Sequence, residues 1–171
     1  FSAFAEDGPW HFKAGESFVK FSVAIEGSPV DGEFTKFSAN ILFDKENLDQ
    51  AKVDITIDSN HIEAAYSDVA TNLKKKDWFD VENFPQARFV SQSFKHLGGN
   101  DYLVTGELTL RNVTRVETLY FTLIEYDATM AQMNGKMTIN RLDYGVGQGG
   151  WRDLSTVGGK VFLNVSVAVY R

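Results

Sequence analysis

The chain has 171 residues, of which 43% are hydrophobic and 23% are charged, and its formal net charge is −6. This length suits one domain with one buried core, and the composition excludes a disordered or fibrous chain. There is no cysteine, which excludes disulfides and thiolate metal sites. The acidic balance argues against a nucleic-acid partner, because phosphates are bound by a clustered basic surface.

The first nine residues carry a small-x-small triplet, Ala3-Phe4-Ala5, of the form that precedes a signal-peptidase cut. The same short triplet also occurs in linkers. We therefore interpret residues 1–9 as a leader remnant or a linker, and residues 10–171 as the folded domain.

The first part of the domain alternates apolar and polar residues, which is the pattern of a strand with one buried face. Residues 53–58 alternate without a fault, with Val53, Ile55 and Ile57 on the same face. Together with the aromatic and β-branched residues around them, such segments predict four strands. They cover residues 17–25, 30–34, 37–43 and 53–58.

A different period follows these strands. Four apolar residues recur at helical spacing: Ile62, Tyr66, Val69 and Leu73. Asn60 lies three residues before Glu63, as in a capping box, so we expect a helix over residues 61–76. Pro85 then returns the chain to strand, because the residue before a proline disfavours helical geometry.

Alternation resumes after Pro85 and predicts the remaining strands: residues 87–94, 102–110, 119–123, 135–141 and 161–169. Glycines crowd residues 144–159, which we predict to form a loop, and not a phosphate-binding loop, because a strand follows instead of a helix. About eight strands with one helix predict an all-β fold, an antiparallel barrel with an internal apolar cavity.

Several phrases, in this order, resemble the YceI-like, or polyisoprenoid-binding, family over residues 10–169. The matching pieces are residues 32–34, 41–44, 53–62, 77–85, 106–114 and 139–145. The resemblance implies a lipocalin-like barrel whose interior holds a polyprenyl chain, commonly in periplasmic or secreted bacterial proteins. The chain departs from the family pattern at three positions: Glu16 stands where His is frequent, Asn112 stands for a usual Gly, and Tyr144 for a usual Phe.

The sequence lacks the parts of common enzymes. His11, His61 and His96 are far apart and form no metal-binding motif, and there is no G-x-S-x-G elbow for a nucleophilic serine. Asp54 and Asp58 are paired carboxylates, but they share the polar face of a strand and are expected to be solvated. We therefore predict no catalytic residues, no metal and no catalytic cofactor.

The inward apolar faces supply the candidates for a cavity wall, although alternation does not separate ligand contacts from plain core. The candidates are Phe21, Phe34, Phe43, Ile55, Ile57, Phe89, Leu108, Leu110, Phe121, Leu123 and Ile139. Gly106 shares the inward face of residues 102–110, so we expect a large side chain there to block a bound tail. Such a tunnel would suit a tail of around 40 carbons, at about 0.8 kcal/mol per buried methylene.

The polar end of the ligand has four candidate contacts: Asn140, Arg141, Trp151 and Arg152. A guanidinium suits a pyrophosphate, and an amide or indole N–H suits a quinone carbonyl. If Arg141 binds an anionic head group, Arg141→Gln should weaken a pyrophosphate lipid more than a quinone. Alternatively, Arg141 forms a structural ion pair with Asp143 or another carboxylate.

Two functions of different class remain. In the first, the protein is a carrier, storage or sequestering protein for a long isoprenoid lipid, either a polyprenyl pyrophosphate or an isoprenoid quinone, with transient membrane contact during lipid exchange. In the second, it is a non-catalytic binding module of a larger exported protein, where the lipid serves another domain's redox or cell-envelope function.

Overall fold

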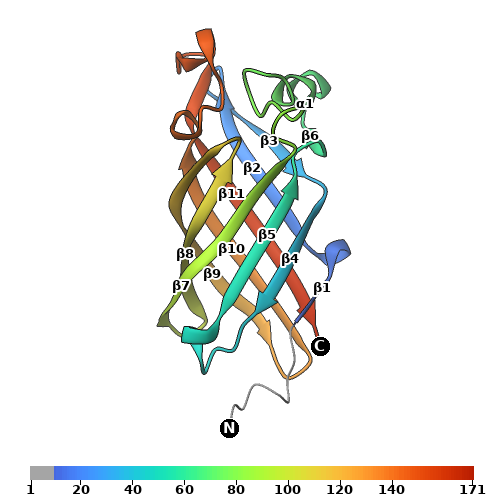
Figure 1. The fold of residues 1–171 in the computed structure, drawn as a ribbon, viewed down its shortest axis with the longest axis vertical. Helices are drawn as coiled ribbons and strands as arrows, with labels where there is room; N and C mark the ends of the chain where they lie inside the picture. The colour runs from blue at the N-terminus through green and yellow to red at the C-terminus, as the bar shows by residue number, and fades with distance from the viewer. Residues whose placement is uncertain (1–9) are drawn as a thin grey trace.

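The alternating segments of the chain form one antiparallel sheet that curls into a barrel (Figure 1). The computed structural model describes residues 10–171, so the interpretation of residues 1–9 lies outside the described residues. The strands are β1 (His11–Phe12), β2 (Phe18–Ile25), β3 (Ser28–Phe34), β4 (Phe37–Leu42), β5 (Lys52–Asp58), β6 (Ile62–Ala64), β7 (Gln86–Gly98), β8 (Asp101–Leu110), β9 (Val113–Tyr126), β10 (Met130–Asn140) and β11 (Val157–Tyr170). The connections include the helix α1 (Ser67–Leu73) and 3-10 turns at Ala14–Glu16, Leu48–Gln50, Arg141–Tyr144 and Gly149–Arg152.

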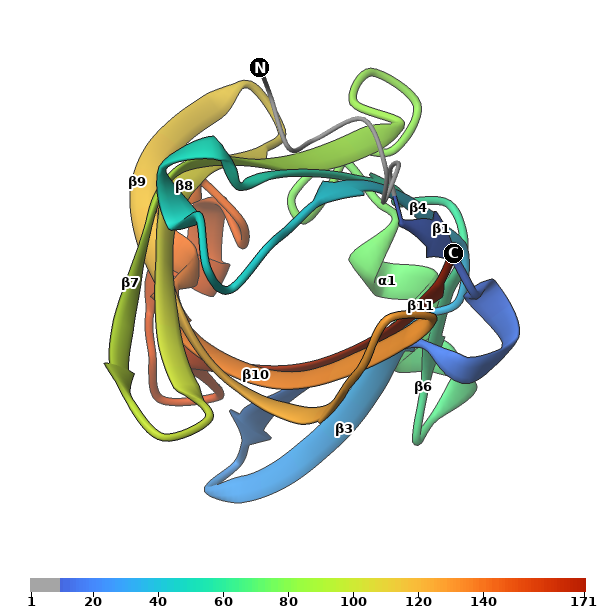
Figure 2. The ribbon, with the colours of Figure 1, turned by 90° about the horizontal axis from the view of Figure 1, so that it is seen from below.

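The two ends of the sheet meet through one bent segment of chain. The strand order is β4-β5-β7-β8-β9-β10-β11-β2-β3-β6. Only residues 35–36 separate β3, which pairs with β2, from β4, which pairs with β5, and Figure 2 shows the resulting ring. If β3 and β4 count as one wall segment, the others are β2, β5 and β7 to β11, which makes eight. The predicted mostly-β barrel with one helix is confirmed.

Alternation predicts the inner face well where only one side of a strand is covered. On β8, every second residue from Tyr102 to Leu110 is buried, and the residues that alternate with them are half-buried or exposed. The pattern fails at the end of β11, where Ser166 is as buried as the inward residues beside it. The N-terminal segment pairs with this end of the strand, with Lys13 N–H donating to the Ala168 carbonyl at 2.9 Å, and the Gln132 amide donates to the Ser166 hydroxyl at 3.4 Å.

The expected helix over residues 61–76 is too long at both ends. Ile62 lies in β6, where it pairs with Phe34 of β3, and α1 runs only from Ser67 to Leu73. The pairing gives residues 62–64 ladder hydrogen bonds that a helix would have replaced, so tertiary pairing overrides the helical spacing. Within residues 10–171, no helix is long and apolar enough to cross a membrane.

The tyrosine that replaces the family's usual phenylalanine has a partner in the barrel wall. Tyr144 is fully buried, and its hydroxyl donates to the Glu117 carboxylate of β9 at 2.7 Å. Burial, followed by this hydrogen bond to a carboxylate, raises the pKa of Tyr144 well above its ordinary value. Tyrosine at this position therefore adds a buried hydroxyl, and Glu117 supplies the hydrogen-bond acceptor that this hydroxyl needs.

This pair supports a double-mutant test of stability. Glu117→Leu should lower the free energy of unfolding by about 1–3 kcal/mol, because it leaves a buried hydroxyl without an acceptor. Adding Tyr144→Phe should recover most of that loss, since the orphaned hydroxyl is then gone. Urea unfolding of the two single variants and the double variant measures the coupling, and strictly additive losses would contradict it.

Candidate functional site

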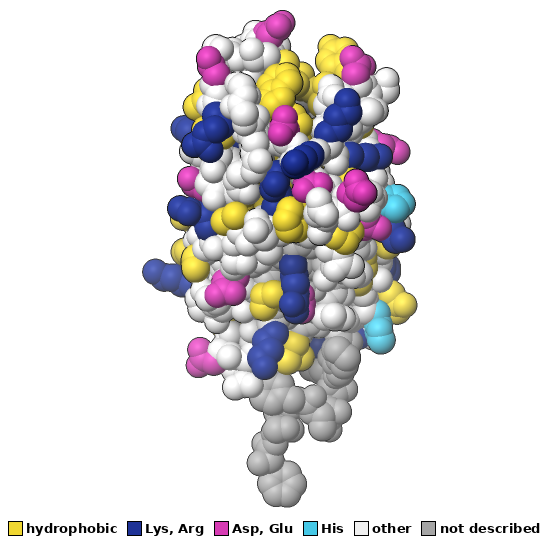
Figure 3. Space-filling model, turned by 45° about the horizontal axis from the view of Figure 1, so that its top comes forward, with side chains coloured by type: hydrophobic (Ala, Val, Ile, Leu, Met, Phe, Trp, Pro, Cys, Tyr) yellow, Lys and Arg dark blue, Asp and Glu magenta, His cyan; other side chains and the backbone are white. Residues whose placement is uncertain are grey.

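The barrel interior holds two separate apolar cavities. The upper cavity, at the end that carries α1 and the Gly149–Arg152 turn, has a volume of about 250 Å³. It reaches solvent beside Asn72, Trp151 and Thr156, which are exposed. Figure 3 shows hydrophobic side chains between the two loops at this end. A molecule that enters the barrel would therefore pass between α1 and the Gly149–Arg152 turn.

The lower cavity lies toward the opposite end of the barrel and has a volume of only about 60 Å³. Aromatic rings close it. Phe43 lies 5.7 Å from Phe94, 5.8 Å from Tyr102 and 6.1 Å from Phe121, measured between ring centroids. Trp10 holds this cluster in place because its indole N–H donates to the Phe43 carbonyl at 2.8 Å. We call these rings the aromatic floor.

The eleven predicted wall residues all lie on one cavity or the other. On the upper cavity are Phe21, Phe34, Ile57, Leu108, Leu110 and Ile139. On the lower cavity are Phe43, Ile55, Phe89, Phe121 and Leu123. Contact with a ligand stays a prediction for each of them. The continuous tunnel expected for a tail of around 40 carbons is, in this structure, two cavities divided by packed side chains.

The four predicted polar contacts are not gathered at one point. Trp151 lines the upper cavity, with its ring 5.4 Å from that of Trp78. Asn140 is exposed and accepts a hydrogen bond from Leu142 N–H at 3.1 Å, so it caps the turn that follows β10. Arg152 is exposed and lines neither cavity. Of the four, Arg141 and Trp151 alone reach the cavity wall.

Arg141 is buried, and every N–H of its guanidinium is engaged by main-chain oxygens. They belong to Gly158 (2.9 Å), Val146 (2.9 Å), Gly147 (3.5 Å), Trp151 (2.6 Å) and Val157 (2.9 Å). Burial lowers the pKa of Arg141, and the face of the Trp78 ring lies 5.2 Å from the guanidinium carbon. The side chain therefore fastens the loop of residues 146–158 to the end of β10.

Neither role expected for Arg141 matches these contacts. Among the described residues, no carboxylate forms an ion pair with it, so the expected pairing with Asp143 is wrong. A head group could take its N–H donors only by displacing the loop carbonyls. The sequence could not reveal this, because main-chain acceptors from a loop leave no side-chain pattern.

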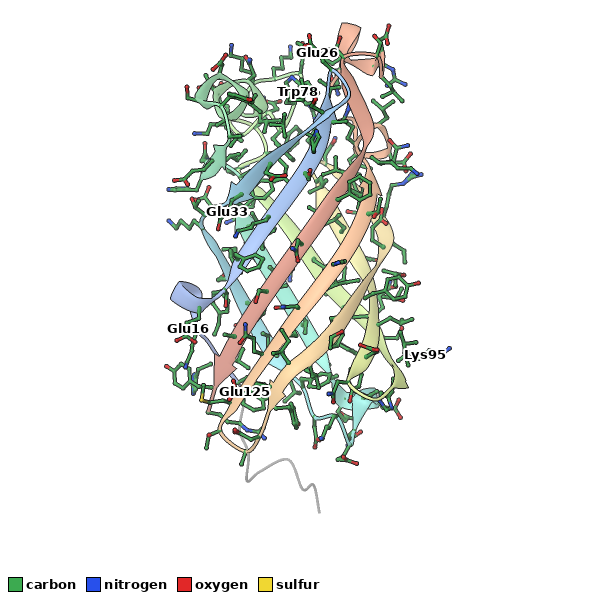
Figure 4. All side chains as sticks on the ribbon, turned by 180° about the vertical axis from the view of Figure 1, so that it is seen from behind. Glu16, Glu26, Glu33, Trp78, Lys95 and Glu125 are labelled. Atoms are coloured by element: carbon green, nitrogen blue, oxygen red, sulfur yellow. The ribbon has the colours of Figure 1, made fainter. Side chains whose placement is uncertain are left out.

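The structure adds mouth residues that alternation could not find. Trp78 and Phe79 follow α1, and both line the upper cavity. Phe79 packs edge-on against Phe34 at 5.6 Å between ring centroids. Figure 4 places Trp78 at the same end of the barrel as Glu26. The resemblance at residues 77–85 marked this segment, but only the tertiary structure turns its rings toward the cavity.

Gly106 does not offer the empty inward space that was expected. A Cβ atom there would lie 2.5 Å from the Val90 carbonyl oxygen and 2.6 Å from the end of the Phe89 ring. Gly106 thus allows the Phe89 ring to approach the backbone of β8 closely. A leucine at position 106 would disrupt the wall, so loss of binding in that variant would not test for a tunnel.

Within the described part of the chain, Asp54 and Asp58 each have a basic partner. No group of three or more His, Asp or Glu residues there could hold a metal ion. Arg88 donates to Asp54 at 2.9 Å, and this hydrogen bond is the main cause that lowers the pKa of the carboxylate. Asp58 lies 3.2 Å from His61. Both carboxylates are partly exposed on the barrel exterior, as predicted.

An antiparallel barrel with an apolar cavity open at one end defines a class of proteins that can enclose one small apolar molecule. The family match is more specific. Residues 10–169 match the family described as the YceI-like domain, and the chain belongs to that family.

Individual relatives agree with this assignment. A UPF0312 protein from Shewanella denitrificans is 32% identical over 108 residues, which are 63% of this chain and 56% of that protein. The match thus spans about half the length of this curated relative. The crystal structure of BcnA from Burkholderia cenocepacia is similar at a TM-score of 0.88 and 30% identity, over 92% of this chain and 99% of that one.

A second solved structure, a polyisoprenoid-binding domain from Saccharophagus degradans implicated in plant cell wall breakdown, shares the fold at lower identity. Its TM-score is 0.74 and its identity 17%, over 94% of this chain and 97% of that one. This likeness shows that the barrel architecture persists when most of the side chains have changed.

Proposed function

We propose that this protein binds the tail of an isoprenoid lipid inside the barrel, with the head group at the mouth of the upper cavity, and that it acts as a carrier and not as an enzyme. The observation that carries the proposal is the cavity of about 250 Å³, which is walled by aliphatic and aromatic side chains and opens between α1 and Trp151. A methyl-branched chain gains affinity there by leaving water. The Saccharophagus domain, described as polyisoprenoid-binding, supports this ligand class.

The mouth favours an uncharged head group, such as a quinone, over a pyrophosphate. The polar side chains on the upper cavity are Asn72, Arg141 and Thr156. Because Arg141 is fully engaged by the loop carbonyls, Asn72, Thr156 and the indole N–H groups of Trp78 and Trp151 are left to contact a ligand. An amide N–H and a hydroxyl suit a carbonyl oxygen, whereas neither neutralises a phosphate.

Transient contact with a membrane would let such a carrier exchange its lipid. Exposed apolar side chains surround the mouth: Tyr66 is 62% exposed, Leu154 48% and Trp151 39%. Tyrosine and tryptophan favour the interface between membrane and water. A periplasmic or secreted location fits this role and belongs to the same proposal.

The alternative is a binding module of a larger exported protein. One observation favours it: the Saccharophagus relative is itself described as a domain, implicated in plant cell wall breakdown. In that case the same cavity would hold a lipid that serves another domain. The cavity chemistry is common to both roles, so the first test addresses the ligand.

Mass spectrometry of an organic extract of the purified protein tests the ligand class. We expect a stoichiometric isoprenoid lipid that is absent from a control protein prepared alongside. Uptake assays with a short-chain ubiquinone and with farnesyl pyrophosphate should show tighter binding of the quinone. Recovery of no lipid, together with no uptake of either compound, would overturn the proposal.

A further inference from the structure

Along β8 and β11, the residues that line the upper cavity and the residues that line the lower cavity are separated at one level of the barrel wall. On β8, Leu108 lines the upper cavity and Val104 the lower, and Gly106 between them lines neither. On β11, Leu163 and Val167 line the upper and the lower cavity in the same way. The two cavities are therefore separated by a waist of packed side chains.

The waist is made of side chains and not of backbone. The Phe89 ring lies over Gly106, and the Leu119 side chain lies over Gly135, where an added Cβ would be 3.1 Å from it. Phe89 and Leu119 both line the lower cavity. A ligand tail can therefore pass the waist when these side chains rotate, and the sheet need not open.

The volumes limit how much tail each cavity holds. An engineered cavity of about 150 Å³ holds one benzene molecule, so the upper cavity suits about ten carbons, or two isoprene units. The lower cavity, of about 60 Å³, suits only two or three carbons. The aromatic floor around Phe43 ends the space below it.

We infer that the barrel selects isoprenoids by tail length: the upper cavity holds the two isoprene units next to the head group, and the end of the third unit crosses the waist into the lower cavity. This inference rests on the proposed function. Affinity then rises while added carbons enter the lower cavity and levels off once the chain meets the aromatic floor, since further carbons stay outside.

The three tryptophans report on the two cavities separately, because Trp78 and Trp151 line the upper cavity and Trp10 lines the lower. Fluorine NMR of fluorotryptophan-labelled protein, with resonances assigned by single Trp→Phe variants, follows each one. Geraniol, with two isoprene units, should shift the Trp78 and Trp151 resonances only. Farnesol, with three, should shift the Trp10 resonance as well.

Two alanine positions give matched variants for affinity measurements. Ala131 lines the lower cavity, so Ala131→Leu should bind geraniol like the unaltered protein and lose the roughly tenfold advantage of farnesol. Ala87 lines the upper cavity, so Ala87→Leu should weaken both alcohols. In the unaltered protein, geranylgeraniol should bind no more than about threefold tighter than farnesol.

The outcomes separate this inference from the proposed function. If the unaltered protein binds none of the three alcohols, both fail. If it binds them but Ala131→Leu leaves the farnesol affinity unchanged, or affinity keeps rising tenfold to geranylgeraniol, the ligand class stands and length selection is wrong. A Trp10 resonance that geraniol shifts as strongly as farnesol would also overturn the division into two cavities.

Discussion

Replacing Arg141 with methionine should lower the free energy of unfolding by about 3–5 kcal/mol. Methionine fills the space of the arginine's methylene stem. The main-chain oxygens of the loop stay buried, however, and lose the N–H donors of the guanidinium. Each orphaned acceptor costs about 1–3 kcal/mol unless the loop opens to water. Urea unfolding measures the total, and hydrogen exchange should show faster exchange over residues 146–158.

Arg152→Met is the matched control, because Arg152 lies in the same segment but is exposed. That change should alter stability by no more than about 0.5 kcal/mol. Arg141→Gln gives a second check: it should weaken a quinone and a pyrophosphate lipid alike, because both lose the ordered mouth. Equal stability of Arg141→Met and Arg152→Met, or a loss confined to the pyrophosphate, would contradict the loop-fastening role.

Gly32→Ala should reduce isoprenoid affinity by roughly tenfold or more, because it pushes a ring into the upper cavity. A Cβ atom at Gly32 would lie 2.2 Å from the end of the ring of Phe21, its partner on β2. The three nearest atoms all belong to that ring, so the ring must move. Phe21 lines the upper cavity, so the displaced ring takes space from the ligand. The overpacking should cost about 1–3 kcal/mol of stability, which still leaves a folded protein.

The double variant Gly32→Ala with Phe21→Leu should recover the lost affinity, since the smaller side chain clears the added methyl group. Gly15→Ala is the control for an added methyl group, because nothing lies within 4 Å of a Cβ at that position. Titration of farnesol into the four proteins measures the effect. An unchanged affinity in Gly32→Ala, or a double variant as weak as the single one, would show that Phe21 does not define the cavity.

The environments of Gly106 and Arg141 in the folded barrel differ from those that the sequence predicts, so substitutions at these two positions would be poor tests of ligand binding. From the sequence, Gly106 is an inward position with room, and Arg141 either contacts a head group or forms an ion pair with a carboxylate. In the folded barrel, Gly106 lies against Phe89 and the Val90 carbonyl, and Arg141 has no free N–H group. The better probes are Gly32, which the sequence marked only as part of a family phrase, and Ala131, which it did not mark.

The sequence by itself determined the long strands, most of their inner faces and eleven of the residues that wall the cavities. Alternation carries this information because a strand places successive side chains on opposite faces, so Leu108 and Leu110 had to be buried once β8 formed. What only the tertiary structure decided is how that buried space is divided and where its mouth lies. Those features depend on contacts between residues far apart in the chain: Ile62 pairing with Phe34, the loop carbonyls on Arg141, and Phe89 lying over Gly106. A local period cannot encode such contacts, since they form only when separate strands and loops meet.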